Sequence, residues 1–120
     1  MTDGMKERAH ELGRMLGQSE EFKAVERARQ RLTEDQDAVG RMQRLDTLER
    51  DIAAYLQNNM EPGEAEKEEY ERLFAELQGS AVYQGFVAAQ SNFDKLVKRM
   101  NEEISKGIEA GAQSRIILPS

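Results

Sequence analysis

The side chain best suited to chemistry in this sequence is His10, the only histidine among 120 residues. It stands three residues after Glu7, and Glu-x-x-His is the spacing with which carboxylate di-iron bundles hold metal from one helical face. Such a centre needs two copies of the motif and further inward-facing glutamates, whereas this chain has one copy, beside Lys6 and Glu11. We therefore expect no metal site, and we interpret His10 as a solvated side chain.

Nucleophilic and redox chemistry lack their usual residues. The chain has no cysteine, which excludes disulfides, thiolate zinc sites and iron–sulfur clusters supplied by this chain. No serine or threonine lies in a recognisable nucleophile elbow, no second histidine offers a base, and no glycine-rich loop is present to cradle phosphate. The sequence therefore indicates a protein that is not an enzyme and that uses no cofactor.

Carboxylates gather between residues 61 and 76. One helical face carries Glu61, Glu64, Glu68 and Glu71, and only Lys67 and Arg72 oppose the acidic side chains of this segment. Such a face is either simply solvated or meets a basic partner surface, where it would steer association and fix register more than add affinity. We treat these four glutamates as candidate partner-binding residues.

A basic row precedes this acidic segment. Lys23, Arg27 and Arg31 are spaced at i, i+4 and i+8, so they line up along one helix, and Arg41 and Arg44 begin the next. The row is a candidate contact for RNA phosphates or for an acidic protein surface. The formal net charge of -6 argues against direct nucleic-acid binding, which normally needs a basic field.

The composition favours helices that position these charged rows. Hydrophobic residues make up 38% and charged residues 33% of the chain, so the apolar surface must be gathered in narrow stripes. Apolar steps of three and four predict five helices, over residues 5–16, 22–32, 39–56, 64–78 and 82–108. We expect an all-α fold.

Capping residues punctuate these stripes. Ser19 and Ser80 are predicted N-caps, and Gly79 is a predicted C-terminal cap. The run from Thr33 to Gln36 has the form of a capping box, with threonine at the cap, and predicts a new helix start or a bend. Residues 58–63, which include Pro62, predict a loop.

The last helix is expected to run for about 27 residues, or roughly 40 Å, which exceeds what the shorter helices can cover. Its uncovered stripe predicts self-association, as a dimer or a larger homo-oligomer. The candidate seam consists of Phe86, Phe93, Leu96, Met100 and Ile104.

Residues 1–112 are expected to form a single helical domain, and residues 113–120 a C-terminal tail with a short apolar patch. The charged N-terminus and the absence of any long apolar run predict neither a signal peptide nor a membrane anchor. We expect a cytoplasmic protein.

The ordered motifs resemble a known family. Ala9-x-x-Leu12-Gly13-x-x-Leu16 followed by Ser19-x-x-Phe22 resembles the start of the YlbF/YmcA/YheA family of small bacterial helical regulatory proteins. Downstream, Glu61-Pro62-Gly63 is similar to the mid-chain loop of that family, and the run from Ser80 to Ile104, with Asn101, is similar to its long last helix. The resemblance covers residues 5–110.

The resemblance implies a five-helix array with a long C-terminal helix that self-associates and acts without catalysis. Family members act in competence, sporulation and biofilm formation, some of them within a complex of related small helical proteins that adjusts a ribonuclease in messenger RNA processing. That complex carries iron–sulfur clusters on cysteines, which this chain lacks, so cluster binding is not carried over.

Two functional hypotheses follow. The first is a regulatory adaptor that binds protein partners, for which the resemblance suggests a ribonuclease and related small helical proteins. The second is a self-assembling helical scaffold with no fixed enzyme partner, and weak RNA binding is a further alternative.

Overall fold

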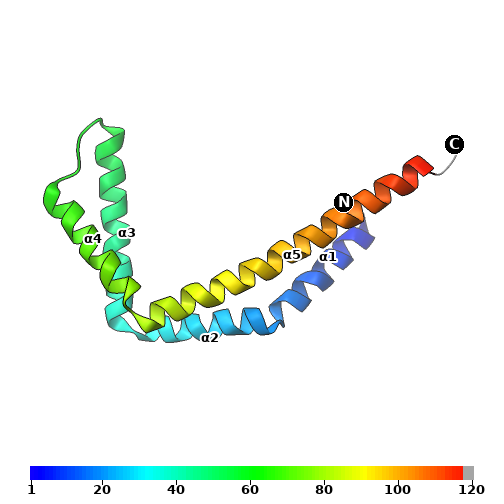
Figure 1. Ribbon diagram of the computed structural model, residues 1–120, viewed down its shortest axis with the longest axis horizontal. Helices are drawn as coiled ribbons and strands as arrows, with labels where there is room; N and C mark the ends of the chain where they lie inside the picture. Colours follow the sequence, from blue (N-terminus) through cyan, green and yellow to red (C-terminus); the bar gives the residue numbers. More distant parts are fainter. Residues whose placement is uncertain (118–120) are drawn as a thin grey trace. The chain divides into compact units, whose positions relative to one another are not determined.

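The computed structural model describes residues 1–117, which form five α-helices (Figure 1). They are α1 (Asp3–Gly17), α2 (Glu20–Glu34), α3 (Gln36–Gln57), α4 (Glu64–Gln78) and α5 (Ala81–Ile117). The predicted all-α class, the five helices and the long last helix are therefore confirmed. The apolar residues Leu118 and Pro119 of the predicted tail lie outside the described residues.

Helix boundaries follow local capping chemistry. The Ser19 hydroxyl accepts a hydrogen bond from the Phe22 N–H at 3.1 Å, and the Ser80 hydroxyl accepts one from the Tyr83 N–H at 3.2 Å. Each serine therefore satisfies a backbone donor that a helix start leaves unpaired. Both predicted serine caps are confirmed.

The predicted capping box is wrong in its residue, although a helix does end and another begin there. Asp35 is the N-cap of α3, and its carboxylate accepts from the Ala38 N–H at 3.0 Å. Thr33 instead belongs to the last turn of α2, where its hydroxyl donates to the Gln30 carbonyl at 2.9 Å. Asp35 is the stronger cap because its charge also complements the positive end of the helix.

The last helix is longer than predicted, at 37 residues, and it extends into the residues expected to form a tail. Between Ile108 and Ile117 the sequence has no proline and contains Ala110 and Ala112, so nothing in this stretch stops the helix. Apolar periodicity predicts only the part of a helix that buries an apolar stripe. The α5 helix continues beyond the end of that stripe, so its full length was not predicted.

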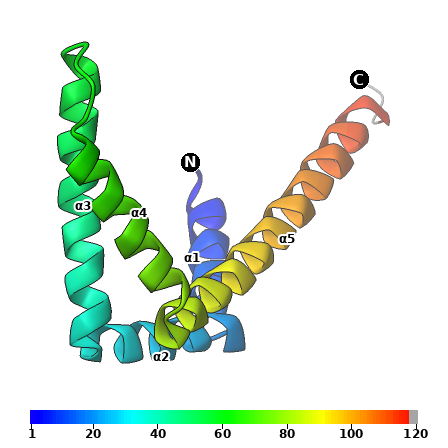
Figure 2. The ribbon, with the colours of Figure 1, turned by 60° about the vertical axis from the view of Figure 1, so that its left-hand side comes forward.

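Contacts divide the chain into two compact units, one of residues 25–88 and the other of residues 1–24 with the chain from residue 89 onward. In the first, α3 and α4 form a hairpin closed by the loop at residues 58–63 (Figures 1 and 2). Its core cluster contains Leu32, Ala38, Leu45 and Leu77. Partly buried apolar residues pack around the cluster, namely Met42, Tyr70, Leu73, Val82, Tyr83 and Phe86.

The second unit is much less buried. No residue of α1 is buried, and every residue of α5 from Asn101 to Gln113 is exposed. Within this unit Phe22 and Phe93 make an edge-on aromatic contact, with ring centroids 5.2 Å apart. This aromatic contact packs α2 against α5 in this unit.

Candidate functional site

Two arginines of α3 bind carboxylates of α4. The Arg44 guanidinium donates to both carboxylate oxygens of Glu69, at 2.7 and 2.9 Å, and Arg41 Nε donates to Glu76 at 2.8 Å. The hydrogen bond from Arg44 lowers the pKa of the Glu69 carboxyl, and the same bond raises the pKa of Arg44. Because Arg44 donates two hydrogen bonds to Glu69, the pair is held in one relative orientation as well as by opposite charge. It therefore sets the register of α3 against α4 in the hairpin.

Two tyrosines reinforce the same hairpin. The Tyr70 hydroxyl donates to Glu49 at 3.1 Å, and the Tyr55 hydroxyl donates to Glu66 at 3.3 Å. The Glu66 charge raises the pKa of Tyr55, and the hydrogen bond to Glu49 raises the pKa of Tyr70. Side chains of α3 therefore bind the carboxylates of α4 that face them. The opposite side of α4 faces solvent.

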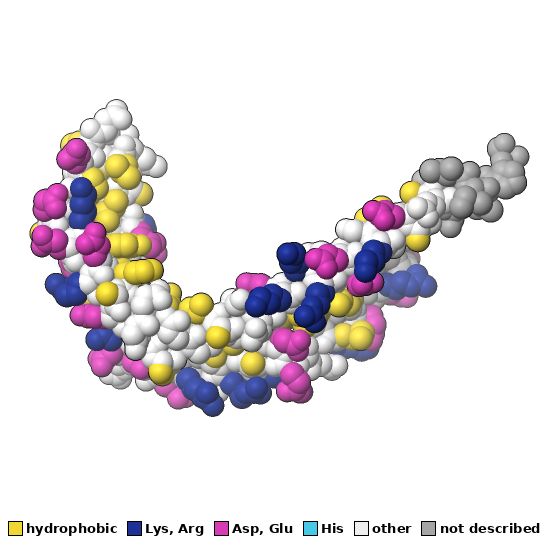
Figure 3. Space-filling view, in the orientation of Figure 1, with side chains coloured by type: hydrophobic (Ala, Val, Ile, Leu, Met, Phe, Trp, Pro, Cys, Tyr) yellow, Lys and Arg dark blue, Asp and Glu magenta, His cyan; other side chains and the backbone are white. Residues whose placement is uncertain are grey.

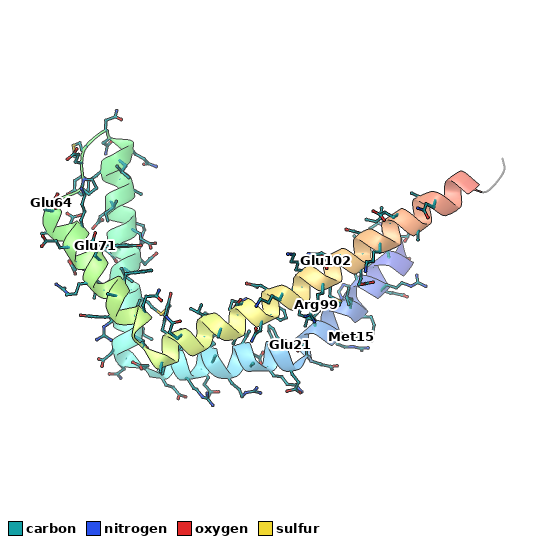
Figure 4. The ribbon with its side chains drawn as sticks, viewed as in Figure 1. Met15, Glu21, Glu64, Glu71, Arg99 and Glu102 are labelled. Atoms are coloured by element: carbon teal, nitrogen blue, oxygen red, sulfur yellow. The ribbon has the colours of Figure 1, made fainter. Side chains whose placement is uncertain are left out.

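Three of the four predicted acidic residues, Glu64, Glu68 and Glu71, lie on that solvent-facing side, and Glu61 lies in the loop before α4. Glu61, Glu64, Glu68 and Glu71 are all exposed, and the ion pair of Glu64 with Lys67 is long, at 3.9 Å. Figure 3 shows acidic side chains gathered along α4, and Figure 4 labels Glu64 and Glu71 on this helix. Glu64, Glu68 and Glu71 follow each other at steps of four and three on α4, so they share one exposed side of the helix, which we call the α4 acidic face.

The predicted basic row is only partly open. Arg27 and Arg31 are exposed on α2, and Lys23 is exposed but lies 3.5 Å from Glu20. Arg41 and Arg44, which continue this row into α3, pair with Glu76 and Glu69 of α4 in the same chain. Whether the row binds a partner stays a prediction.

The predicted oligomer seam divides along α5. Phe86 packs against the core cluster, and Phe93 lies against Phe22, so both already have partners in their own chain. Leu96 and Met100 are partly buried, and Ile104 is 49% exposed. Whether these residues meet a second copy stays a prediction.

The sequence patterns missed a basic cluster on α5. Lys95, Lys98 and Arg99 are exposed, and Lys95 and Arg99 line a shallow groove with Glu21. Figure 4 labels Arg99 and Glu21. The three basic residues lie within five positions of one another, and this clustering could have predicted the patch. The apolar stripe on the same helix was the stronger pattern and drew the interpretation.

His10 lies exposed on α1, as its charged neighbours indicated. Within the described residues, no group of three histidine, cysteine, aspartate or glutamate side chains is placed to hold a metal ion. Among the described helices, none combines the length and apolar character needed to cross a membrane.

Comparison with known protein families gives a match over most of the chain. Residues 5–109 match the family described as "Control of competence regulator ComK, YlbF/YmcA". The chain belongs to this family. No curated protein matches the sequence.

Membership in the YlbF/YmcA family confirms the resemblance read from the Leu-Gly and Ser-x-x-Phe motifs. The description of this family, control of a competence regulator, indicates a regulatory role.

Proposed function

We propose that this chain is a non-enzymatic regulatory adaptor that acts by protein–protein binding, with the α4 acidic face as the surface that receives a basic partner. The observation that carries the proposal is the sorting of carboxylates on α4. Glu69 and Glu76 are bound by arginines of α3, while Glu64, Glu68 and Glu71 point away from the hairpin core. The exposed side of α4 therefore carries carboxylates that no side chain of α3 binds, which leaves them available to a basic partner.

The charge balance of the chain supports this choice of surface. Residues 25–88 hold fourteen carboxylates against eight basic side chains, which accounts for the whole net charge of -6. Residues 61–78 alone hold seven carboxylates against two basic side chains. A concentrated field of one sign steers a basic partner and excludes acidic ones, although each exposed ion pair adds little affinity.

The partner we propose is part of the machinery of messenger RNA processing, either a ribonuclease or related small helical proteins. This follows the resemblance to family members with that role, and it agrees with a regulatory family description. Through it the chain would act on competence, sporulation and biofilm formation in the bacterial cytoplasm. Because the chain has no cysteine, the proposed role uses no iron–sulfur cluster.

The test is affinity capture of the tagged full chain from bacterial lysate, with and without ribonuclease, compared with a charge-reversal variant. The variant combines Glu64→Lys, Glu68→Lys and Glu71→Lys. A matched control reverses three exposed glutamates of the other unit, Glu7, Glu102 and Glu109, so that both variants have the same net charge.

We expect a protein partner that survives ribonuclease, is lost from the α4 variant and is kept by the control. Capture that disappears with ribonuclease and that depends on Arg27 and Arg31 would replace this proposal with direct RNA binding. Recovery of the chain alone would favour the scaffold hypothesis.

A further inference from the structure

One side of the α3–α4 hairpin exposes large apolar side chains. Leu56 of α3 is 61% exposed, Phe74 of α4 is 46% exposed, and Met60 in the loop that joins the two helices is 51% exposed. Figure 3 shows hydrophobic side chains gathered on one side of this hairpin. Apolar residues that gather on one surface are typical of a binding site for another macromolecule.

Two rows of side chains make up this surface. On α3, Met42, Glu49 and Leu56 follow each other at steps of seven, which keeps them on one side of the helix. On α4, Tyr70 and Phe74 are four residues apart and stack, with ring centroids 6.3 Å apart. The Tyr70 hydroxyl donates to Glu49 at 3.1 Å, so the two rows lie beside each other. We call the surface formed by Met42, Leu56, Tyr70 and Phe74 the hairpin apolar face.

The arginine pairs lie along the other edge between the two helices. One residue turns an α-helix by about 100°, so Glu69 and Tyr70 diverge on either side of the buried stripe that contains Leu77. Arg44 binds Glu69 on the first edge, and this pair links α3 to α4 through polar groups. The second edge holds the hairpin apolar face, where part of the apolar surface stays in contact with water.

Carboxylates border the hairpin apolar face on both helices. Glu49 is exposed in the middle of the α3 row, and Glu71 is exposed three residues before Phe74. Lys67 lies on the same side of α4, but its ammonium is 3.9 Å from the Glu64 carboxylate, which offsets its charge. The whole net charge of -6 resides in the unit that contains this face. The surface therefore suits an occupant with apolar residues flanked by lysine or arginine.

We propose that the hairpin apolar face binds an amphipathic helix of the partner protein, with its apolar side against Leu56 and Phe74 and with basic side chains beside the bordering carboxylates. The inference rests on the proposed function, and it names the kind of segment through which the basic partner binds. The row from Met42 to Leu56 is about 21 Å long at 1.5 Å per residue, so the occupant is a helix of about four turns.

The chemistry of the face favours this occupant over two others. A helix satisfies its own backbone hydrogen bonds and presents apolar anchors at i, i+3 or i+4 and i+7. An extended segment would find no strand edge here, because the face consists of side chains from two helices. The same face of a second copy would bring Glu49 and Glu71 of both chains within a Debye length of about 8 Å, where they repel each other.

The test uses a synthetic helical peptide of about 16 residues, with leucines along one side and lysines flanking them. Fluorescence anisotropy of the labelled peptide, titrated with the purified full chain, measures the Kd. A second peptide keeps the leucines and replaces every lysine by glutamate. We expect the lysine peptide to bind, and the glutamate peptide to bind at least about tenfold more weakly, because the bordering carboxylates repel it.

Two double variants of the chain locate the binding surface. Leu56→Ala with Phe74→Ala should weaken binding of the lysine peptide by about tenfold or more, because both apolar anchors are truncated. The matched control is Met5→Ala with Met15→Ala, at two residues of α1 that are each 59% exposed, and it should bind like the native chain. Circular dichroism checks that both variants keep their helical signal, which alanine favours.

Three results of the titration overturn the proposal: no binding to the native chain, equal binding of the two peptides, or equal loss in the control variant. Sedimentation velocity tests whether a second copy holds the face instead. A native oligomer that Leu56→Ala with Phe74→Ala converts into monomers would assign the hairpin apolar face to self-association and reject a partner helix.

Capture from lysate separates this inference from the proposed function. If charge reversal on the α4 acidic face removes the partner while Leu56→Ala with Phe74→Ala retains it, the proposed function stands and the hairpin apolar face is rejected. If charge reversal leaves capture unchanged, the proposed function fails, and the peptide titration still reports separately on the hairpin apolar face.

Discussion

Replacing Leu77 by alanine should destabilise the protein more than replacing the larger Phe74 by alanine. The two residues lie three apart on α4 and belong to one stripe in the sequence. Leu77 is 2% exposed and part of the core cluster, whereas Phe74 is 46% exposed and stacks on Tyr70, with ring centroids 6.3 Å apart.

The magnitudes follow from what each change leaves behind. Leu77→Ala opens a cavity among packed side chains and should cost about 3 kcal/mol in the free energy of unfolding. Phe74→Ala leaves no enclosed cavity and removes one partly solvated aromatic contact, so it should cost about 1 kcal/mol. For a chain of this length the larger cost lowers Tm by roughly 10 °C.

Urea titration followed by far-ultraviolet circular dichroism measures both costs, and equal m-values ensure that the comparison is between like transitions. The native chain and both variants should be measured at one pH and one protein concentration, since association adds to apparent stability. If Phe74→Ala proves as costly as Leu77→Ala, the assignment of the hairpin core to Leu77 is refuted.

Three further changes test local contacts. Asp35→Ala should cost about 1 kcal/mol by removing the N-cap of α3, while Thr33→Ala should cost less than half as much, and thermal melting compares the two. Because its partner Arg44 lowers the pKa of Glu69, the carboxylate stabilises the fold above its unfolded pKa and this contribution is lost as pH falls through the folded pKa. The acid side of a stability–pH curve should therefore be less steep for Arg44→Gln, and an unchanged curve would contradict the pairing. Phe93→Leu removes an edge-on aromatic contact and should cost about 1 kcal/mol, and no loss on melting would argue against that contact.

Helix order and helix starts were accessible from the sequence because they depend on neighbours along the chain. Ser19 and Ser80 cap their helices through N–H groups three residues away, so the signal and the contact share one short segment. Asp35 was missed as the cap of α3 because Thr33, two residues earlier, also offers an acceptor, and only helix geometry decides between them. The end of α5 was missed because an exposed helix with few apolar residues has no periodic pattern to follow.

The partner surfaces were harder to locate because they depend on how one helix faces another. On α4, Glu69 and Glu76 are seven residues apart and therefore share one side, while Glu64, Glu68 and Glu71 share a different side. The sequence contains both sets but not the orientation of α4 toward α3. Arg41 and Arg44 supply that orientation, and they do so only once the hairpin is formed.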